Sequence, residues 1–256
     1  MPFFKSRVMR KEPVIGTFCG IVNASAVELT GTCGFDFLCI DAEHSPIDRG
    51  AAEQMIRAAD VSRIPAIVRV PGLNAEAIAS VLDSRAKGVL VPRVGTAEQA
   101  MAAVRATRYP PLGERGVGPG RAAAYGSNIG EYLGKANAEL LLAIQIETAE
   151  GLQNIEAIAA VEGIDVIFIG PGDLSVSLNA MGPENAERLN QAITTIVTTS
   201  AKAGKVTGMF RMSADDVNDW GGLGVSFFVV ASDTLFLAAG AQATVNAFKA
   251  KIGESR

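Results

Sequence analysis

The sequence FDFLCIDAEHSP, residues 35–46, is an apolar stretch that ends abruptly in charged and polar residues. A short run of β-branched and aromatic residues bounded by polar groups is typical of a buried strand. Asp41, Glu43 and His44 stand where this strand would end. The stretch therefore predicts a buried strand whose carboxyl end carries acidic and imidazole groups.

The same pattern recurs along the chain, because short apolar runs alternate with Ala-rich amphipathic segments. This alternation is typical of a parallel sheet joined by crossover helices. Eight strands are predicted, at residues 14–21, 35–41, 66–70, 88–92, 140–147, 166–170, 206–210 and 226–230. Helices are predicted to begin near Ser25, Asp48, Asn74, Thr96, Thr148, Pro183, Ser213 and Ser232. Eight such units in 256 residues favour a (β/α)8 TIM barrel over an open doubly wound sheet.

Domain organisation is expected to be simple. No Ser/Gly linker, low-complexity tract or shift in composition suggests a boundary, so residues 1–256 are predicted to form one domain. One stretch breaks the alternation of strands and helices. Residues 109–135 are rich in Gly, Pro and Arg, and we predict a long functional loop there.

The composition excludes several classes of function. The net charge of -4, without a run of five like charges, gives no surface suited to nucleic acid or an anionic membrane. The apolar runs are too short to span a bilayer, and no secretory signal is recognised, so a cytoplasmic protein is expected. The three cysteines lack CxxC spacing, which argues against a disulfide framework or a zinc cluster. Neither GxxxxGK[ST] nor GxGxxG after the first strand is present, which argues against an ATP or dinucleotide enzyme.

Polar residues at the ends of the predicted strands are the candidate site, since a barrel carries its chemistry at the carboxyl ends of its strands. They are Asp41, Glu43, His44, Arg69, Gln145, Glu147, Gly170, Gly172 and Asp173. His44 is the only histidine and suits proton transfer near neutral pH. Glu147 and Asp173 could converge on one divalent cation.

Each of these residues also has a purely structural interpretation. A lone histidine can be a packing residue, and two carboxylates can belong to salt bridges. The turn GPGDLS offers backbone N–H groups to a carboxylate or phosphate, but Gly-rich turns also serve tight geometry alone. Arg69, within an apolar strand, must find an anionic partner or ligand.

Several segments together resemble the HpcH/HpaI family of metal-dependent pyruvate aldolases. They are FDFLCIDAEHSP, AIVRV, RATRYPPLGERGVGPGRA, LLLAIQIET and DVIFIGPGDLS, and the resemblance covers residues 16–248. It implies an aldehyde-lyase that reversibly cleaves a 4-hydroxy-2-oxo acid to pyruvate, or a related 2-oxo acid, and an aldehyde through a metal-bound enolate. A Schiff-base aldolase would need a lysine in the pocket, whereas Lys87, Lys202 and Lys205 precede strands and Lys135 lies in or beside the long loop.

The resemblance also implies roles for individual residues. Glu147 and Asp173 would bind Mg2+, Mn2+ or Co2+, and Arg69 would stabilise the enolate oxygen. The Gly172 and Asp173 amides in the turn after Gly170 would hold the pyruvate carboxylate, with Gln145 orienting it. His44, beside Asp41, would move protons through a metal-associated water.

Asp83 would orient His44 from a neighbouring subunit, which implies a homo-oligomer. The family is typically a hexamer, a trimer of dimers, with exchanged C-terminal helices, and residues 232–252 are apolar enough for such an exchange. Arg85 departs from the family pattern, which commonly has Gly at this position after the helix. We therefore expect an altered cap geometry or a strain cost there.

Other functions stay open at this point. An oxaloacetate-type decarboxylase or an acyl-CoA lyase could use the same metal-enolate chemistry, although the chain is short for the CoA branch. A non-catalytic 2-oxo acid binding protein or structural oligomer is a different class. The aldehyde is not identified: a sugar-derived, a dicarboxylic and an aromatic adduct all remain, and Arg115, Arg121 and Tyr125 are candidates for contacting its tail.

Overall fold

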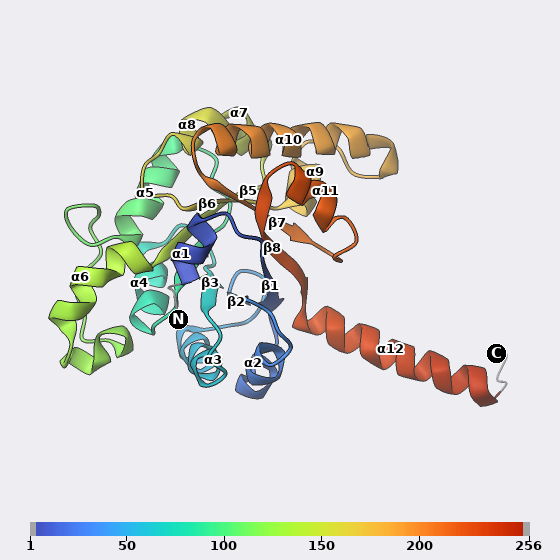
Figure 1. Ribbon diagram of the computed structural model, residues 1–256, viewed down its shortest axis with the longest axis horizontal. Coiled ribbons are helices and arrows are strands. Elements are labelled where there is room, and N and C mark those ends of the chain that lie inside the picture. Colours follow the sequence, from blue (N-terminus) through green and yellow to red (C-terminus); the bar gives the residue numbers. More distant parts are fainter. Residues whose placement is uncertain (1–3, 253–256) are drawn as a thin grey trace.

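Eight parallel strands close a barrel in sequence order (Figure 1). The computed structural model describes residues 4–252. The strands are β1 Val14–Cys19, β2 Phe37–Asp41, β3 Ala66–Arg69, β4 Gly88–Val91, β5 Leu141–Ile146, β6 Val166–Ile169, β7 Val206–Arg211 and β8 Val225–Ser232. Each coincides with a predicted strand within two residues at either end, and the predicted (β/α)8 barrel is confirmed.

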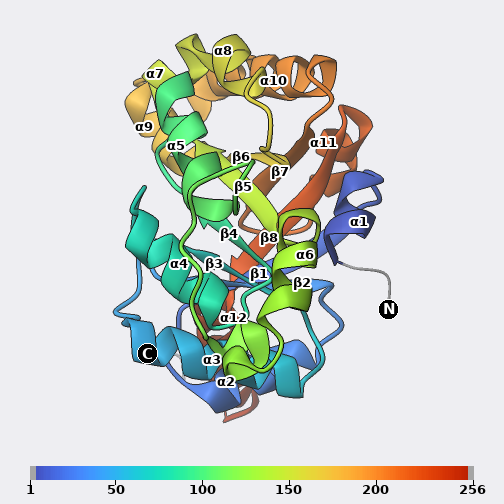
Figure 2. The same ribbon diagram turned by 90° about the vertical axis from the view of Figure 1, so that its left-hand side faces the viewer.

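Helices surround the strands (Figure 2). They are α1 Phe4–Met9, α2 Ala24–Gly31, α3 Arg49–Val61, α4 Ala75–Asp83, α5 Ala97–Thr107, η1 Arg121–Gly126, α6 Ile129–Glu139, α7 Ala149–Gln153, α8 Ile155–Ala159, α9 Pro171–Ser177, η2 Pro183–Asn185, α10 Ala186–Lys202, α11 Val217–Gly222 and α12 Asp233–Ile252. The side chains of Asp48, Asn74, Thr96 and Thr148 accept hydrogen bonds from the first turns that follow them. They act as N-caps, as their residue types predict.

Aromatic side chains fill the amino-terminal half of the barrel. Phe37 and Phe227 stack with ring centroids 4.4 Å apart, and Phe4 of α1 packs against Phe37 at 5.2 Å. A Cβ at Gly16 would lie 2.5 Å from the Phe37 ring, so a side chain at that position would displace the stack. Helix α1, which the sequence did not predict, therefore closes this end of the barrel.

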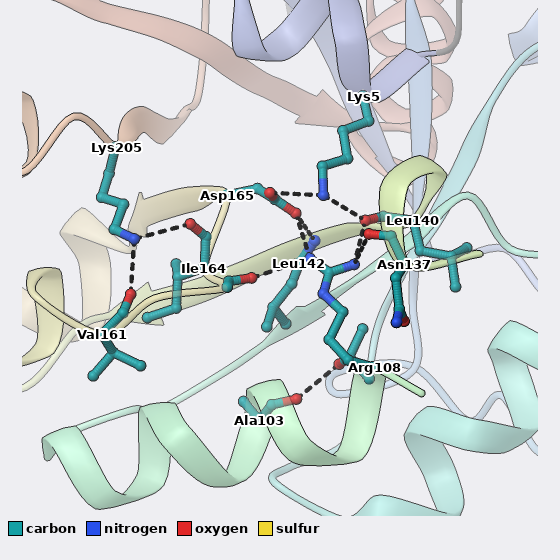
Figure 3. Close-up of polar contacts among 12 residues, drawn as sticks. Lys5, Ala103, Arg108, Asn137, Leu140, Leu142, Val161, Ile164, Asp165 and Lys205 are labelled. Atoms are coloured by element: carbon teal, nitrogen blue, oxygen red, sulfur yellow. Dashed lines mark hydrogen bonds and ion pairs between the residues drawn. The ribbon is translucent and has the colours of Figure 1, made fainter. Parts of the chain in front are cut away.

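A buried polar network fastens α1 at the same end (Figure 3). Lys5 Nζ lies 2.8 Å from one carboxylate oxygen of Asp165, and Arg108 Nη2 donates to the other at 2.8 Å. The same oxygen accepts from the Leu142 backbone N–H at 2.8 Å. Every charge in this network has a partner, so removing one of them would leave another buried and unpaired at the end of the barrel opposite the predicted site.

Residues 109–135 are not a continuous loop, and this prediction was wrong. The extended part is followed by η1 and α6, and Tyr132 packs edge-on against Tyr109 with ring centroids 6.2 Å apart. The Gly and Pro residues favoured the prediction of a loop, although part of this segment is helical and packs through Tyr132 against Tyr109.

Arg85 follows α4 in the left-handed region, with a φ of 83°. Its N–H donates to Leu82 O at 3.0 Å, and the next N–H, of Ala86, donates to Val81 O at 3.1 Å. These two bonds are those of a Schellman cap, which usually takes Gly at the left-handed position. The expected strain is confirmed and costs about 1 kcal/mol for a residue with a Cβ.

Helix α12 extends away from the barrel (Figure 1). Asp233 at its start is buried, whereas Phe236, Leu237 and Phe248 are 43%, 66% and 62% exposed. Exposed apolar side chains gathered on one element are typical of an interaction surface. Among residues 4–252, no helix has the length and apolar character needed to cross a membrane.

Candidate active site

A cleft of about 420 Å³ opens at the carboxyl end of the barrel. It brings together seven of the predicted site residues: Asp41, His44, Arg69, Gln145, Gly170, Gly172 and Asp173. Phe18, Gly20, Ser45, Phe168, Pro171, Phe210, Ser232 and Thr234 complete its lining. Within residues 4–252 no lysine lines this cleft, as the sequence led us to expect.

Arg69 ends β3 and is held by Asp41 at the end of β2. Its Nε donates to Asp41 Oδ1 at 2.9 Å and its Nη2 to Oδ2 at 2.7 Å, and both side chains are buried. The guanidinium carbon lies 4.2 Å from the centre of the Phe18 ring. Burial in such a setting requires a charge partner, and Asp41 supplies it with the two-bond geometry that an arginine fits best.

His44 lies at the mouth of the cleft with 61% of its side chain exposed. Its Nε2 is 3.6 Å from Glu43 Oε2, and its backbone N–H donates to Asp41 Oδ1 at 3.3 Å. Glu43 also lies 3.4 Å from Arg69 Nε, and burial raises the pKa of its carboxyl. An accessible imidazole beside a carboxylate can accept and return a proton from a bound molecule.

Glu147 follows β5 and lies beneath the cleft floor. Its Oε1 accepts from the Arg93 backbone N–H at 2.8 Å, and its Oε2 accepts from the Gln145 side-chain amide. A Cβ at Gly170 would come within 2.8 Å of Glu147 Oε2, so glycine leaves this carboxylate open toward β6. The fold therefore fixes the buried Glu147 directly beside Gly170, which lines the cleft.

Among the described residues, Glu147 has no positively charged side chain as a hydrogen-bond partner. Burial, followed by the charges of Glu43 and Asp173, raises the pKa of Glu147 to about 7. Gln145 Oε1 and Glu43 Oε2 are buried without a hydrogen-bond partner. A hard divalent cation prefers such oxygen donors and would supply the missing positive charge, so the residues present fit a metal ion.

The protein would supply few of the ligands. In the described part of the chain, no group of three or more His, Cys, Asp or Glu side chains is arranged to hold a metal ion. Glu147 and Asp173 would therefore leave coordination positions to water and substrate, as a catalytic site requires.

Helix α9 begins directly at the cleft. Gly172 and Asp173, predicted to lie in a turn, belong to its first turn, with Gly170 as N-cap and Pro171 at the first helical position. First-turn N–H groups have no acceptor within their helix and can bind an anionic group.

Comparison with known proteins agrees with this geometry. Residues 15–239 match the model of the HpcH/HpaI aldolase/citrate lyase family. The chain belongs to this family. A hydroxypyruvate/pyruvate aldolase of Paraburkholderia phytofirmans is 37% identical over 240 residues, covering 91% of this chain and 92% of the relative. A 5-keto-4-deoxy-D-glucarate aldolase of Klebsiella pneumoniae is 35% identical over 246 residues, 96% of each chain.

Among solved structures, an HpcH/HpaI aldolase/citrate lyase family protein of Burkholderia cenocepacia superposes with a TM-score of 0.90 at 32% identity. The alignment covers 96% of this chain and 98% of the other. The resemblance stated from the sequence is thus confirmed at the level of the family. The names of its relatives support a metal-dependent aldolase better than the decarboxylase or CoA-lyase alternatives.

Of the predicted site residues, Glu147 adjoins the cleft beside Gly170 without lining it, whereas Asp83 is not brought to the cleft. It ends α4, which leads into the amino-terminal end of β4, whereas the cleft lies at the carboxyl ends of the strands. Arg115 Nη2 donates to its Oδ1 at 2.5 Å. In this HpcH/HpaI chain Asp83 therefore cannot contact its own His44, and its role remains a prediction about a neighbouring subunit.

The three residues predicted to contact the tail of the aldehyde bind other side chains instead. Arg115 is bound to Asp83, Arg121 lies 2.7 Å from Asp60, and Tyr125 accepts from Arg57 at 2.6 Å. None of Arg115, Arg121 and Tyr125 lines the cleft of its own chain.

Sequence reasoning missed several cleft residues. Phe18 and Phe210 form an aromatic wall with ring centroids 5.6 Å apart, and Ser45, Ser232 and Thr234 add hydroxyl groups. Ser45 directly follows His44, and that adjacency was an available signal. Glu43 was recognised at the strand end but given no role, although it contacts both Arg69 and His44.

Proposed function

We propose that this protein is a metal-dependent aldehyde-lyase that reversibly joins pyruvate, or a related 2-oxo acid, to an aldehyde. The observation that carries the proposal is that Arg69 and His44 line one cleft, with the buried carboxylate of Glu147 directly beside Gly170 of its lining, in a chain of this family. Carbon–carbon cleavage needs an electron sink and a proton carrier, and these groups supply both.

Glu147 and Asp173 would hold the metal ion, which we propose is Mg2+, Mn2+ or Co2+. When bound, it would act as a Lewis acid toward the oxygens of the 2-oxo acid. Gln145 holds the Glu147 carboxylate in place and would orient the 2-oxo acid. The N–H groups of Gly172 and Asp173 would receive the substrate carboxylate at the start of α9.

In the cleavage direction, His44 would take the proton from the C4 hydroxyl of the 4-hydroxy-2-oxo acid. The C3–C4 bond then breaks, the aldehyde leaves, and the electron pair moves to the C2 oxygen as an enolate. Arg69, fixed by Asp41, has its Nη1 free of any hydrogen bond in the described residues and would donate to that oxygen. His44 would then return the proton to C3, which completes pyruvate and regenerates the free imidazole.

We further propose that the active protein is a homo-oligomer, a hexamer in the family pattern, with α12 exchanged between subunits. The exposed apolar side chains of α12 support this proposal. The cytoplasmic location expected from the sequence stays a prediction.

Proton–deuterium exchange at the pyruvate methyl, followed by NMR, tests the proposed function without any assumption about the aldehyde. Protein stripped with EDTA is compared with protein resupplied with Mg2+, Mn2+ or Co2+. We expect exchange only with metal, and its loss in Glu147→Gln. Absence of exchange with every metal would overturn the pyruvate assignment, and parallel assays of oxaloacetate decarboxylation and CoA-ester cleavage would then identify the alternatives.

A further inference from the structure

The end of β8 has an irregular backbone at the edge of the cleft. Gly16 and Phe18 of β1 pair with Val229 and Ser232 of β8, so β8 contains one residue more than β1 over this stretch. Ala231 lies in the left-handed region with a φ of 54°. Such bulges and strained residues concentrate at functional sites, where they redirect side chains.

Asp233 binds the irregular end of β8 to the end of β1. Its buried carboxylate accepts from the N–H groups of Gly20 at 3.0 Å and Ile21 at 2.9 Å, and also from Thr234 N–H at 2.8 Å. The ends of β1 and β8 are thereby joined. Ser232 and Thr234, on either side of Asp233, are held at the cleft with their hydroxyl oxygens 2.8 Å apart.

Ser45 brings a third hydroxyl from the loop after β2. A Cβ at Gly20 would lie 2.7 Å from Ser45 Oγ, so a larger residue there would displace this hydroxyl. Among residues 4–252, the Ser45 hydroxyl has no hydrogen-bond partner. Three hydroxyl groups, two from the end of β8 and one from the loop after β2, therefore line the cleft on either side of β1.

The opposite side of the cleft carries the groups proposed for the 2-oxo acid, from β3, β5 and β6. The aldehyde must therefore approach over β8, β1 and β2. Within the described residues, the titratable side chains lining the cleft are Asp41, His44, Arg69 and Asp173. Arg69 is already paired with Asp41, so a carboxylate on the aldehyde would find no unpaired arginine or lysine of this chain in the cleft.

We propose that the second substrate is an uncharged hydroxyaldehyde, whose hydroxyl groups bind Ser45, Ser232 and Thr234 while its carbons pack on Phe18 and Phe210. The inference rests on the proposed function and names the substrate class of the same site. A site built to hydrogen-bond a hydroxyl discriminates against an analogue that lacks one, because its polar groups are then left unpaired.

The test measures kcat/KM for aldol synthesis from pyruvate and each of four aldehydes: glycolaldehyde, propanal, in which a methyl group replaces the hydroxyl of glycolaldehyde, and the carboxylated glyoxylate and succinic semialdehyde. We expect glycolaldehyde to exceed propanal by about tenfold or more, the value of one well-formed hydrogen bond. Thr234→Val and Ser45→Ala should each bring this ratio toward one. Thr234→Ser keeps the hydroxyl and should keep the ratio.

Thr198→Val, on the exposed face of α10, is the matched control and should leave the ratio unchanged. A higher kcat/KM for either carboxylated aldehyde, or an unchanged ratio in both Thr234→Val and Ser45→Ala, would overturn the inference. Metal-dependent methyl exchange by the wild-type protein separates these results from a failure of the proposed function, in which no exchange occurs at all.

Discussion

Arg69 and Asp41 form two parallel hydrogen bonds, 2.9 Å and 2.7 Å long, across the ends of adjacent strands. Lysine cannot reproduce this pair, because its single ammonium group lacks the planar fork. We expect Arg69→Lys to slow metal-dependent methyl exchange by about 10² or more, as for removal of one oxyanion donor. The NMR exchange rate measures this, with Arg105→Lys on the exposed face of α5 as control. An unchanged rate would exclude Arg69 from stabilising the enolate.

His44 is accessible from the cleft mouth and is the proposed proton carrier. Replacing it with Ala should cut retro-aldol turnover by about 10² or more, the contribution usual for a general acid-base group. Steady-state assays of pyruvate release measure the loss. If turnover is unchanged, His44 has no part in the mechanism.

The strands were predictable because their signal is local. Each barrel strand is a contiguous apolar run. A polar residue at the end of such a run, such as Arg69 in β3 or Glu147 after β5, is recognised without knowledge of distant residues. Helix α1 could not be found this way, because Phe4 is stabilised by Phe37 and Lys5 by Asp165, which lies far along the chain. The turn GPGDLS was expected to offer N–H groups at a helix start, but the helix itself was predicted near Pro183, because PGDLS is typical of a turn as well as of a helix start.

Some residues of the candidate site could likewise be predicted from local sequence, and others could not. Strand topology predicts that Asp41, Arg69 and Gln145 meet, since strand ends of a barrel converge. No local pattern could have predicted that a bulge and Asp233 hold Ser232 at the cleft, because the acceptors and donors come from opposite ends of the chain. The position of Asp83 relative to a His44 side chain could not be predicted from local sequence either, because the site proposed for Asp83 belongs to another subunit.

Metal affinity should depend on pH through Glu147. Burial, with the charges of Glu43 and Asp173, raises its pKa to about 7. Below that pH a proton competes with the metal ion for the carboxylate, so the affinity for Mn2+ should fall about tenfold between pH 8 and pH 6. Calorimetric titrations of the stripped protein measure this. Glu187→Gln should retain the pH dependence, and Glu147→Gln should bind weakly throughout; a flat profile in the wild type contradicts the assignment.

Helix α12 should hold subunits together through its apolar side chains. Phe248→Glu places a charge on a surface that the oligomer would bury, at a cost of about 2 kcal/mol or more per subunit. We expect sedimentation velocity to show smaller species than in the wild type. Gln242→Glu adds the same charge at a polar position of α12 and is the control. Identical sedimentation of Phe248→Glu and wild type would show that α12 is not part of the assembly.

Arg115 binds the Asp83 carboxylate and leaves part of it exposed, where another subunit could contact it. The Arg115 side chain is fully buried, with its guanidinium 4.7 Å from the Tyr109 ring, whereas Asp83 stays 31% exposed. If Asp83 orients the partner's imidazole, His44→Ala and Asp83→Ala should each be inactive alone.

Co-expression of these two variants should restore activity, since random assembly gives about one quarter of sites an intact pair. Affinity tags of different kinds on the two chains allow mixed oligomers to be purified before turnover is measured. Adding Arg115→Gln to the His44→Ala chain, which supplies Asp83, should lower the restored activity more than adding Arg115→Lys to that chain, because lysine keeps a cation beside Asp83. Activity in Asp83→Ala alone, or none in the mixed oligomers, would place His44 and Asp83 in unrelated roles.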